Sequence, residues 1–145
     1  MDLVNLAQEI ETFLTDNAKE FERMGSLDAD GCAWGFALED PSVAGFLSCE
    51  SNHEDLGFAT VSLALSMMDG SNRTRDEMVR LMQINTAFYN AALVATPPDG
   101  DGNFGVMLAR KIPAEQFRLD DLVPHIRNML GQAEMFLFRR SGNVN

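Results

Sequence analysis

Apolar residues recur along this chain with two different periods, and each period predicts a different kind of element. Residues 2–24 repeat apolar positions at helical spacing, and at about 100° per residue these positions fall within one sector about 140° wide. A small core needs a stripe of roughly 100° or slightly more, so one margin of this helix is expected to be only half covered. The stripe comprises Leu3, Leu6, Ala7, Ile10, Phe13, Leu14, Phe21 and Met24, with Leu6, Phe13 and Met24 toward that margin.

Three segments with strand character follow this helix. In residues 32–39, large apolar side chains alternate with small ones, so another backbone can come close on the small-residue side. Residues 43–50 form the second predicted strand, and residues 56–67 are apolar on both faces, which is typical of a central strand. Short polar links between the three predict an antiparallel meander. The small side chains of the first strand are Ala33, Gly35 and Ala37.

A second helix is predicted over residues 74–86. Thr74 precedes its first turn and Glu77 stands three residues later, which is the spacing of a capping box. Residues 88–95 are interpreted as a fourth strand, which is only weakly apolar. Residues 97–102 are proline, aspartate and glycine, so they predict a hairpin loop into the strand that follows.

The last third of the chain alternates over residues 105–112 and then becomes helical. Pro113 ends the strand, because it has no N–H group for a ladder. Asp120 can cap the closing helix, which keeps apolar positions at helical spacing and runs to Arg140. The predicted order is therefore α-β-β-β-α-β-β-α. The fold class is α+β, a single domain over residues 1–145 with an antiparallel sheet and flanking helices.

Composition narrows the range of partners. The chain has 145 residues, a hydrophobic content of 46% and a net charge of −11, with 22 acidic against 11 basic residues. This hydrophobic content favours a folded domain, and phosphate backbones would repel so acidic a surface, so neither nucleic acid nor anionic membrane is expected as a partner. The chain shows no secretory signal and no apolar run of about 18 residues. With two cysteines, it is expected to be a reduced cytoplasmic protein.

Metal-capable side chains gather around the turn after the second predicted strand. A zinc site usually needs four ligands arranged as pairs at fixed spacing, and here one cysteine and one histidine lack a second pair. The turn is therefore interpreted as solvated, and no metal is expected. The cluster comprises Cys49, Glu50, His53, Glu54 and Asp55.

Two other segments resemble chemical sites only in part. Residues 99–103 start like a calcium-binding loop, but Phe104 replaces the required glycine and Arg110 stands where a bidentate glutamate belongs. His125 lies beside the apolar stripe of the last helix, and no nucleophile motif accompanies it. No glycine-rich loop precedes a helix to cradle a phosphate. The sequence therefore predicts no enzyme activity and no cofactor.

The stretch from Gly105 to Arg140 also carries a family resemblance. Leu-Ala-Arg in a strand, then Ile-Pro, then Leu-Asp-Asp-Leu at a helix start and Ala-Glu-Met-Phe near its end resemble the C-terminal signature of class I type III secretion chaperones, the Tir chaperone family. The predicted element order, the small size and the acidic composition are also similar to that family. Phe136-Leu137-Phe138 departs from it, because many members have a tryptophan next to a basic residue there.

The resemblance implies a homodimer without enzyme activity in the bacterial cytoplasm. Such chaperones bind the N-terminal region of a secreted effector in extended form and keep it soluble and secretion-competent until it reaches the export apparatus. In the family the second helix and the next strand usually build the dimer, and the matching positions here are Met78, Leu81, Met82, Asn85, Phe88 and Tyr89. The effector usually meets apolar patches on the first helix and the sheet, and the candidates here are Leu6, Phe13, Met24, Trp34, Phe36 and Phe46.

Two other functions remain open at this point. One is a small-ligand-binding or sensory α+β domain, in which the same aromatic residues would line a pocket. The other is a cytoplasmic protein that has the fold but no role in secretion. A dominant protein partner would favour the chaperone, whereas a bound metabolite would favour the pocket.

Overall fold

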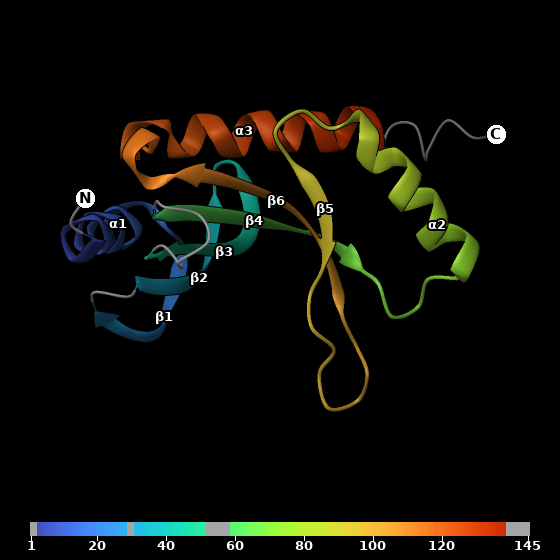
Figure 1. The fold of residues 1–145 in the computed structure, drawn as a ribbon, viewed down its shortest axis with the longest axis horizontal. Coiled ribbons are helices and arrows are strands. Elements are labelled where there is room, and N and C mark those ends of the chain that lie inside the picture. Colours follow the sequence, from blue (N-terminus) through green and yellow to red (C-terminus); the bar gives the residue numbers. More distant parts are fainter. Residues whose placement is uncertain (1–2, 29–30, 52–58, 139–145) are drawn as a thin grey trace.

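A six-stranded antiparallel sheet with the strand order β1-β2-β3-β4-β6-β5 organises the computed structural model, which describes residues 3–28, 31–51 and 59–138 (Figure 1). Two helices pack against the sheet and a third projects beyond it. The strands are β1 (Glu20–Asp28), β2 (Gly31–Glu39), β3 (Ser42–Glu50), β4 (Thr60–Asp69), β5 (Ala92–Ala95) and β6 (Gly105–Pro113). The helices are α1 (Leu3–Asn17), α2 (Arg75–Ile84) and α3 (Leu122–Ala133). The predicted α+β class with an antiparallel sheet and flanking helices is confirmed.

One face of the sheet holds the core. Trp34 of β2 pairs with Leu47 of β3, which pairs in turn with Leu63 of β4, and all three are fully buried. Directly paired residues project from the same face, so this row marks the covered side. Helices α1 and α3 contribute to the same apolar cluster, because their stripes face these strands. The helical residues in it are Leu3, Leu6, Ala7, Ile10, Leu14, Leu122, Ile126, Met129 and Ala133.

The opposite face of β1, β2 and β3 is partly open to solvent. The positions that alternate with the core residues of β2 are small, as the sequence pattern predicts, and none of them is fully buried. Two large apolar side chains stand among them, since Met24 is 52% exposed and Phe46 is 42% exposed. This face therefore offers apolar surface that the chain itself does not bury.

The predicted helix over residues 2–24 is wrong in its second half. Helix α1 ends at Asn17, and residues from Glu20 onward form β1, paired with β2 from Glu20 opposite Ala37. Phe21 and Met24 fit the helical stripe, but Glu20-Phe21-Glu22-Arg23-Met24 also alternates. Pairing with β2 places Phe21 opposite Phe36 over the core, and this tertiary contact decides between the two patterns. The sheet therefore has one strand more than predicted.

Other element boundaries shift by a few residues. The third predicted strand, residues 56–67, corresponds to β4, and residues 56–58 lie outside the described part of the chain. The fourth predicted strand, residues 88–95, is reduced to β5, because the chain turns at Asn90 with a left-handed φ of 53°.

The closing helix also differs from its predicted bounds. A 3₁₀ turn at Leu119–Asp121 precedes α3, and the capping position is Asp121 instead of the predicted Asp120, with no side-chain capping bond. After α3 the chain continues as a π-helical turn, Glu134–Phe138. The predicted end of this helix at Arg140 lies outside the described residues.

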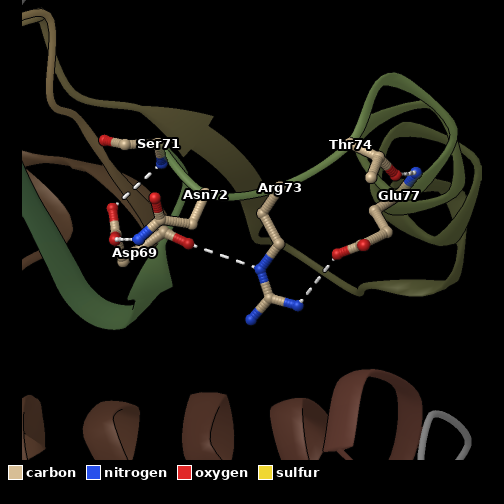
Figure 2. A network of polar contacts seen from close by, with 6 residues as sticks. All are labelled: Asp69, Ser71, Asn72, Arg73, Thr74 and Glu77. Carbon is tan, nitrogen blue, oxygen red and sulfur yellow. Dashed lines mark hydrogen bonds and ion pairs between the residues drawn. The ribbon is translucent and has the colours of Figure 1, made fainter.

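A polar network sets the direction in which α2 leaves the sheet (Figure 2). The Asp69 carboxylate accepts hydrogen bonds from Ser71 N at 2.9 Å and from Asn72 Nδ2 at 3.0 Å, and these bonds lower the pKa of Asp69. Thr74 caps the helix by accepting from Glu77 N at 3.1 Å, as predicted. The Glu77 carboxylate pairs with Arg73 at 3.2 Å instead of returning to the cap. Hydrogen bonds therefore fix the start of α2, although the helix buries none of its side chains.

Candidate interaction surfaces

Three of the six predicted docking residues belong to the core. Trp34 is fully buried, and Phe36 of β2 and Leu6 of α1 are buried in the same apolar cluster. A side chain that the chain already covers cannot offer apolar surface to a partner, so these three leave the candidate set. The expectation that Leu6 is half covered is therefore not met, because α1 turns it fully toward the sheet.

Met24 and Phe46 lie together on the open face of the sheet. A methyl group built on Gly35 would lie 3.5 Å from the Phe46 ring and 3.9 Å from the Met24 sulfur, so the two side chains flank this glycine. Beside them is a depression of about 400 Å³, here called the sheet hollow. Its floor is formed by small residues of β2 and β3 and its rim by two carboxylates of β1. The lining residues on this face are Glu20, Glu22, Gly35, Ala37 and Ala44.

Phe13 lies in a second depression on the outer side of α1. Phe13 and Leu119 are half-buried and provide its apolar part, while Glu9 and Asp16 stand along it. This α1 groove has a volume of about 470 Å³. The groove therefore combines partly exposed apolar side chains with acidic ones, as the sheet hollow does.

Helix α2 buries none of its side chains. Met82 is 71% exposed and Val79 is 43% exposed, while Met78 and Leu81 are half-buried. Figure 1 shows this helix standing beyond the end of the sheet. Between it and the C-terminal turn lies a groove of about 530 Å³, whose apolar lining residues are Met67, Met68, Leu81, Ile84, Leu137 and Phe138.

Two of the predicted dimer residues have structural roles inside the chain. Phe88 is buried and meets Phe136 edge to face, with ring centroids 5.8 Å apart. Asn85 binds the backbone of Leu93 twice, since its Oδ1 accepts from Leu93 N at 2.7 Å and its Nδ2 donates to Leu93 O at 3.3 Å. Asn85 thus occupies backbone groups of β5 that a further strand would otherwise use. Tyr89, by contrast, is 74% exposed.

A buried arginine fastens the turn after α2 to α3. Arg110 donates to Asn90 O at 2.8 Å, to Tyr89 O at 3.3 Å and to Asn128 Oδ1 at 2.8 Å. Its Nη1 lies 3.0 Å from His125 Nδ1, and because a guanidinium only donates, this ring nitrogen must accept. Burial lowers the pKa of Arg110, and burial together with the Arg110 charge lowers the pKa of His125.

The sequence reasoning missed this clamp, although a signal for it was present. Arg110 occupies the same face of β6 as Val106 and Leu108, because the three residues alternate along the strand. Since Val106 and Leu108 are apolar, this pattern predicts that the Arg110 side chain points toward the core. Gln132 completes the clamp, because it accepts from Tyr89 N at 2.7 Å and donates to Tyr89 O at 3.1 Å. A buried charge needs such partners, and helix α3 supplies them.

The remaining candidates for chemistry can be followed only where the structure describes them. Cys32 and Cys49 are buried opposite one another on β2 and β3 and form no disulfide, and burial raises the pKa of Cys49. Of the predicted metal-capable cluster, residues 53–55 lie outside the described residues. Within the described ranges, no group of three or more histidine, cysteine or acidic residues is placed to hold a metal ion. Asp99 is a turn residue, because its Oδ1 accepts from two backbone N–H groups of its own loop.

Comparison with known proteins adds no relative. A scan against protein-family models found no match, and a search of curated proteins found no significant match. No helix in the described ranges has the length and apolar character needed to cross a bilayer.

Proposed function

We propose that this protein is a homodimeric chaperone of the class I type III secretion kind, which binds the N-terminal region of a secreted effector in extended form. The observation that carries the proposal is a pair of partly apolar depressions, one on the outer side of α1 and one on the open face of β1, β2 and β3. The α1 groove contains Phe13, and the sheet hollow lies next to Met24 and Phe46. A chaperone for an unfolded segment needs several such contacts along a path, not one deep pocket.

The edge of the sheet supports the same proposal. β1 is the terminal strand of the sheet order, and it pairs only with β2 among the described strands. An edge strand presents backbone donors and acceptors to which an extended segment can add as a further strand. The sheet hollow lies along this edge, whereas the α1 groove is formed by α1 and Leu119, so a segment paired with β1 would reach the α1 groove only by continuing over α1. Backbone pairing would contribute affinity and the two depressions would contribute side-chain contacts.

A second copy of the chain is the proposed cover for α2. Helix α2 and Tyr89 expose apolar side chains, and the groove behind the helix is also lined by apolar residues. Apolar patches of this kind on a protein surface are usually interaction sites. The resemblance of the last third of the chain to the chaperone family assigns the dimer to this helix as well. A small-molecule site lined by the predicted aromatics is less favoured, because Trp34 and Phe36 are core residues.

The decisive experiment identifies the partner and then measures how a substitution at Phe13 changes its affinity. Crosslinking in the native host followed by mass spectrometry identifies the partner, and its N-terminal segment is then titrated by calorimetry against the purified protein. We expect Phe13→Asp to weaken this binding by more than about 1 kcal/mol, the scale of a contact that matters. Thr15→Asp, with the same added charge on an exposed position of α1, is the matched control and should bind normally.

The fold of each variant must be checked beside the binding. If Phe13→Asp unfolds the protein in urea titrations, Phe13 belongs to the core and the α1 groove is not a docking site. If its fold and its affinity are both unchanged, the segment docks elsewhere. A tightly bound metabolite with no protein partner would favour the ligand-binding alternative instead.

A further inference from the structure

The side chains of β1 differ sharply between its two faces. Toward the core, Phe21 lies opposite Phe36, and Arg23 is held by Glu11 at 2.9 Å. Toward the sheet hollow, Glu20 and Glu22 are exposed and Met24 follows them at the next position on that face. Strand geometry spaces these three side chains evenly along the edge.

Glu20 and Glu22 of the hollow lie opposite uncharged residues in the described part of the chain. Their cross-strand partners on β2 are Ala37 for Glu20 and Gly35 for Glu22, which carry no charge. None of the ion pairs formed within the described residues involves either glutamate. Two like charges on alternate residues of one strand face repel each other, and a cation placed opposite relieves that repulsion. The chain keeps this acidic pair next to an open strand edge and an apolar patch.

We infer that Glu20 and Glu22 determine the specificity of the β1 edge by selecting an extended partner segment with alternating basic side chains and an apolar anchor. The inference rests on the proposed function and names the chemistry of its partner. Basic residues would lie opposite Glu20 and Glu22, and an apolar residue opposite Met24 would pack against the Met24 side chain. An antiparallel segment would therefore carry the order apolar-x-basic-x-basic, and a parallel segment the reverse order.

Charge complementarity favours such a segment over other occupants. The whole chain has a net charge of −11, so a second copy of the chain would be repelled from an acidic rim. A basic segment would be attracted at a distance and then paired at contact. The small floor at Gly35 and Ala37 leaves room for long basic side chains to lie across the sheet, with their alkyl stems against it.

Synthetic peptides provide a direct test on the intact protein. The first 13-residue peptide carries leucine, lysine and lysine on alternate positions, with threonine and serine elsewhere. The second replaces both lysines by glutamine, and the third moves both lysines by one position to the other strand face. Affinity is measured by fluorescence anisotropy at low salt, and the site is mapped from the amide shifts of Met24 and Gly35.

We expect the first peptide to bind about tenfold more tightly than the second and third, since each cross-strand charge pair contributes about two- to fivefold. In Glu20→Gln/Glu22→Gln this preference should disappear. The control Asp101→Asn/Glu115→Gln removes the same charge from exposed positions away from the hollow and should retain the preference.

The outcomes separate this inference from the proposed function. Equal binding of all three peptides, or a preference that survives in Glu20→Gln/Glu22→Gln, overturns the charge selection but leaves an extended-segment chaperone intact. Failure of every peptide to bind overturns the β1 edge as a docking site and removes support from the proposed function. Sedimentation that shows self-association through the hollow, lost in the glutamine variant, would assign this face to a second copy and also overturn the inference.

Discussion

Helices α1 and α2 have amphipathic sequences of the same kind, yet the chain treats them in opposite ways. Helix α1 buries five side chains against the sheet, whereas α2 buries none. Both have apolar residues three and four positions apart, such as Leu6 and Ile10 in α1 and Met78 and Met82 in α2. An amphipathic pattern therefore indicates that a helix needs a covering surface, but does not indicate which molecule supplies it.

The difference arises from where each helix is attached. Helix α1 leads through a short link into β1, and Lys19 N already donates to Ala37 O at 2.8 Å, so the helix folds back along the sheet. Helix α2 follows the network around Asp69, and the turn after its far end is fastened to α3 through the Arg110 clamp. Hydrogen bonds thus hold the segments before and after α2, while the helix itself stands beyond the sheet (Figure 1). Such an arrangement suits a surface that is prepared for a partner.

The largest expected effect is a difference in the free energy of unfolding between substitutions in α1 and in α2. Ile10→Ala removes a fully buried side chain of α1 and should cost about 2–5 kcal/mol in urea unfolding at any protein concentration. Met82→Ala removes a side chain that is 71% exposed, so within a single chain it should change stability by less than about 0.5 kcal/mol. Any larger effect of Met82→Ala should grow with protein concentration, because it would act through the dimer. Equal, concentration-independent losses would show that α2 is part of the same core.

The next effect concerns assembly. Analytical ultracentrifugation of the wild type should give about twice the 16.0 kDa chain mass at tens of micromolar. Met82→Glu places an unpaired charge in the proposed apolar interface and should shift the protein toward monomer by at least about 2 kcal/mol. Gln83→Glu adds the same charge to an exposed neighbouring position of α2 that points away from Met82, and should remain dimeric. A dimeric Met82→Glu variant would place the interface elsewhere, and a monomeric wild type would contradict the dimer itself.

Much of this fold follows from residue patterns, and the failures have identifiable causes. The alternation of Trp34 and Phe36 with Gly35 and Ala37 predicts the strand correctly. It also indicates which face is covered, since large aromatics belong inside, so the prediction of Trp34 and Phe36 as docking residues conflicts with this same pattern. Strand β1 was missed because Phe21 fits both a helical and a strand period, and only pairing with β2 decides between them.

The candidate surfaces were harder to predict than the fold. Phe13, Met24 and Phe46 were named from the sequence, and the structure shows them partly exposed. The sheet hollow could not be predicted, because it depends on the register that places Glu20 and Glu22 opposite Ala37 and Gly35. Residues that act through tertiary contacts leave only weak local signals. The helical pattern of α2 predicts an apolar face. That this face is not covered by the sheet is known only from the folded chain.

The smallest expected effect is confined to the junction between the two regions. His125 Nδ1 accepts from Arg110, so protonating this ring would remove the acceptor and place a second positive charge beside the guanidinium. Burial and Arg110 lower the pKa of His125, against a smaller opposing effect of Asp121. A histidine with a lowered folded pKa contributes stability that is complete above its ordinary pKa of about 6.5 and is lost as the pH falls toward the folded value.

Hydrogen exchange can detect this local loss. Between pH 7.5 and pH 5.5 we expect the protection factor of the Tyr89 amide to fall most and that of Leu93, which Asn85 also holds, to fall less, while those of Ile10 and its neighbours in α1 stay constant, because the clamp fixes the turn after α2. His125→Gln should keep an acceptor for Arg110 that does not titrate, and should abolish the pH dependence. The Asp69 network does not interfere, because its carboxylate has a pKa below the ordinary value near 4 and titrates outside this window. A uniform loss of protection across α1 and the turn would mean that acid acts on the whole fold and not on the junction.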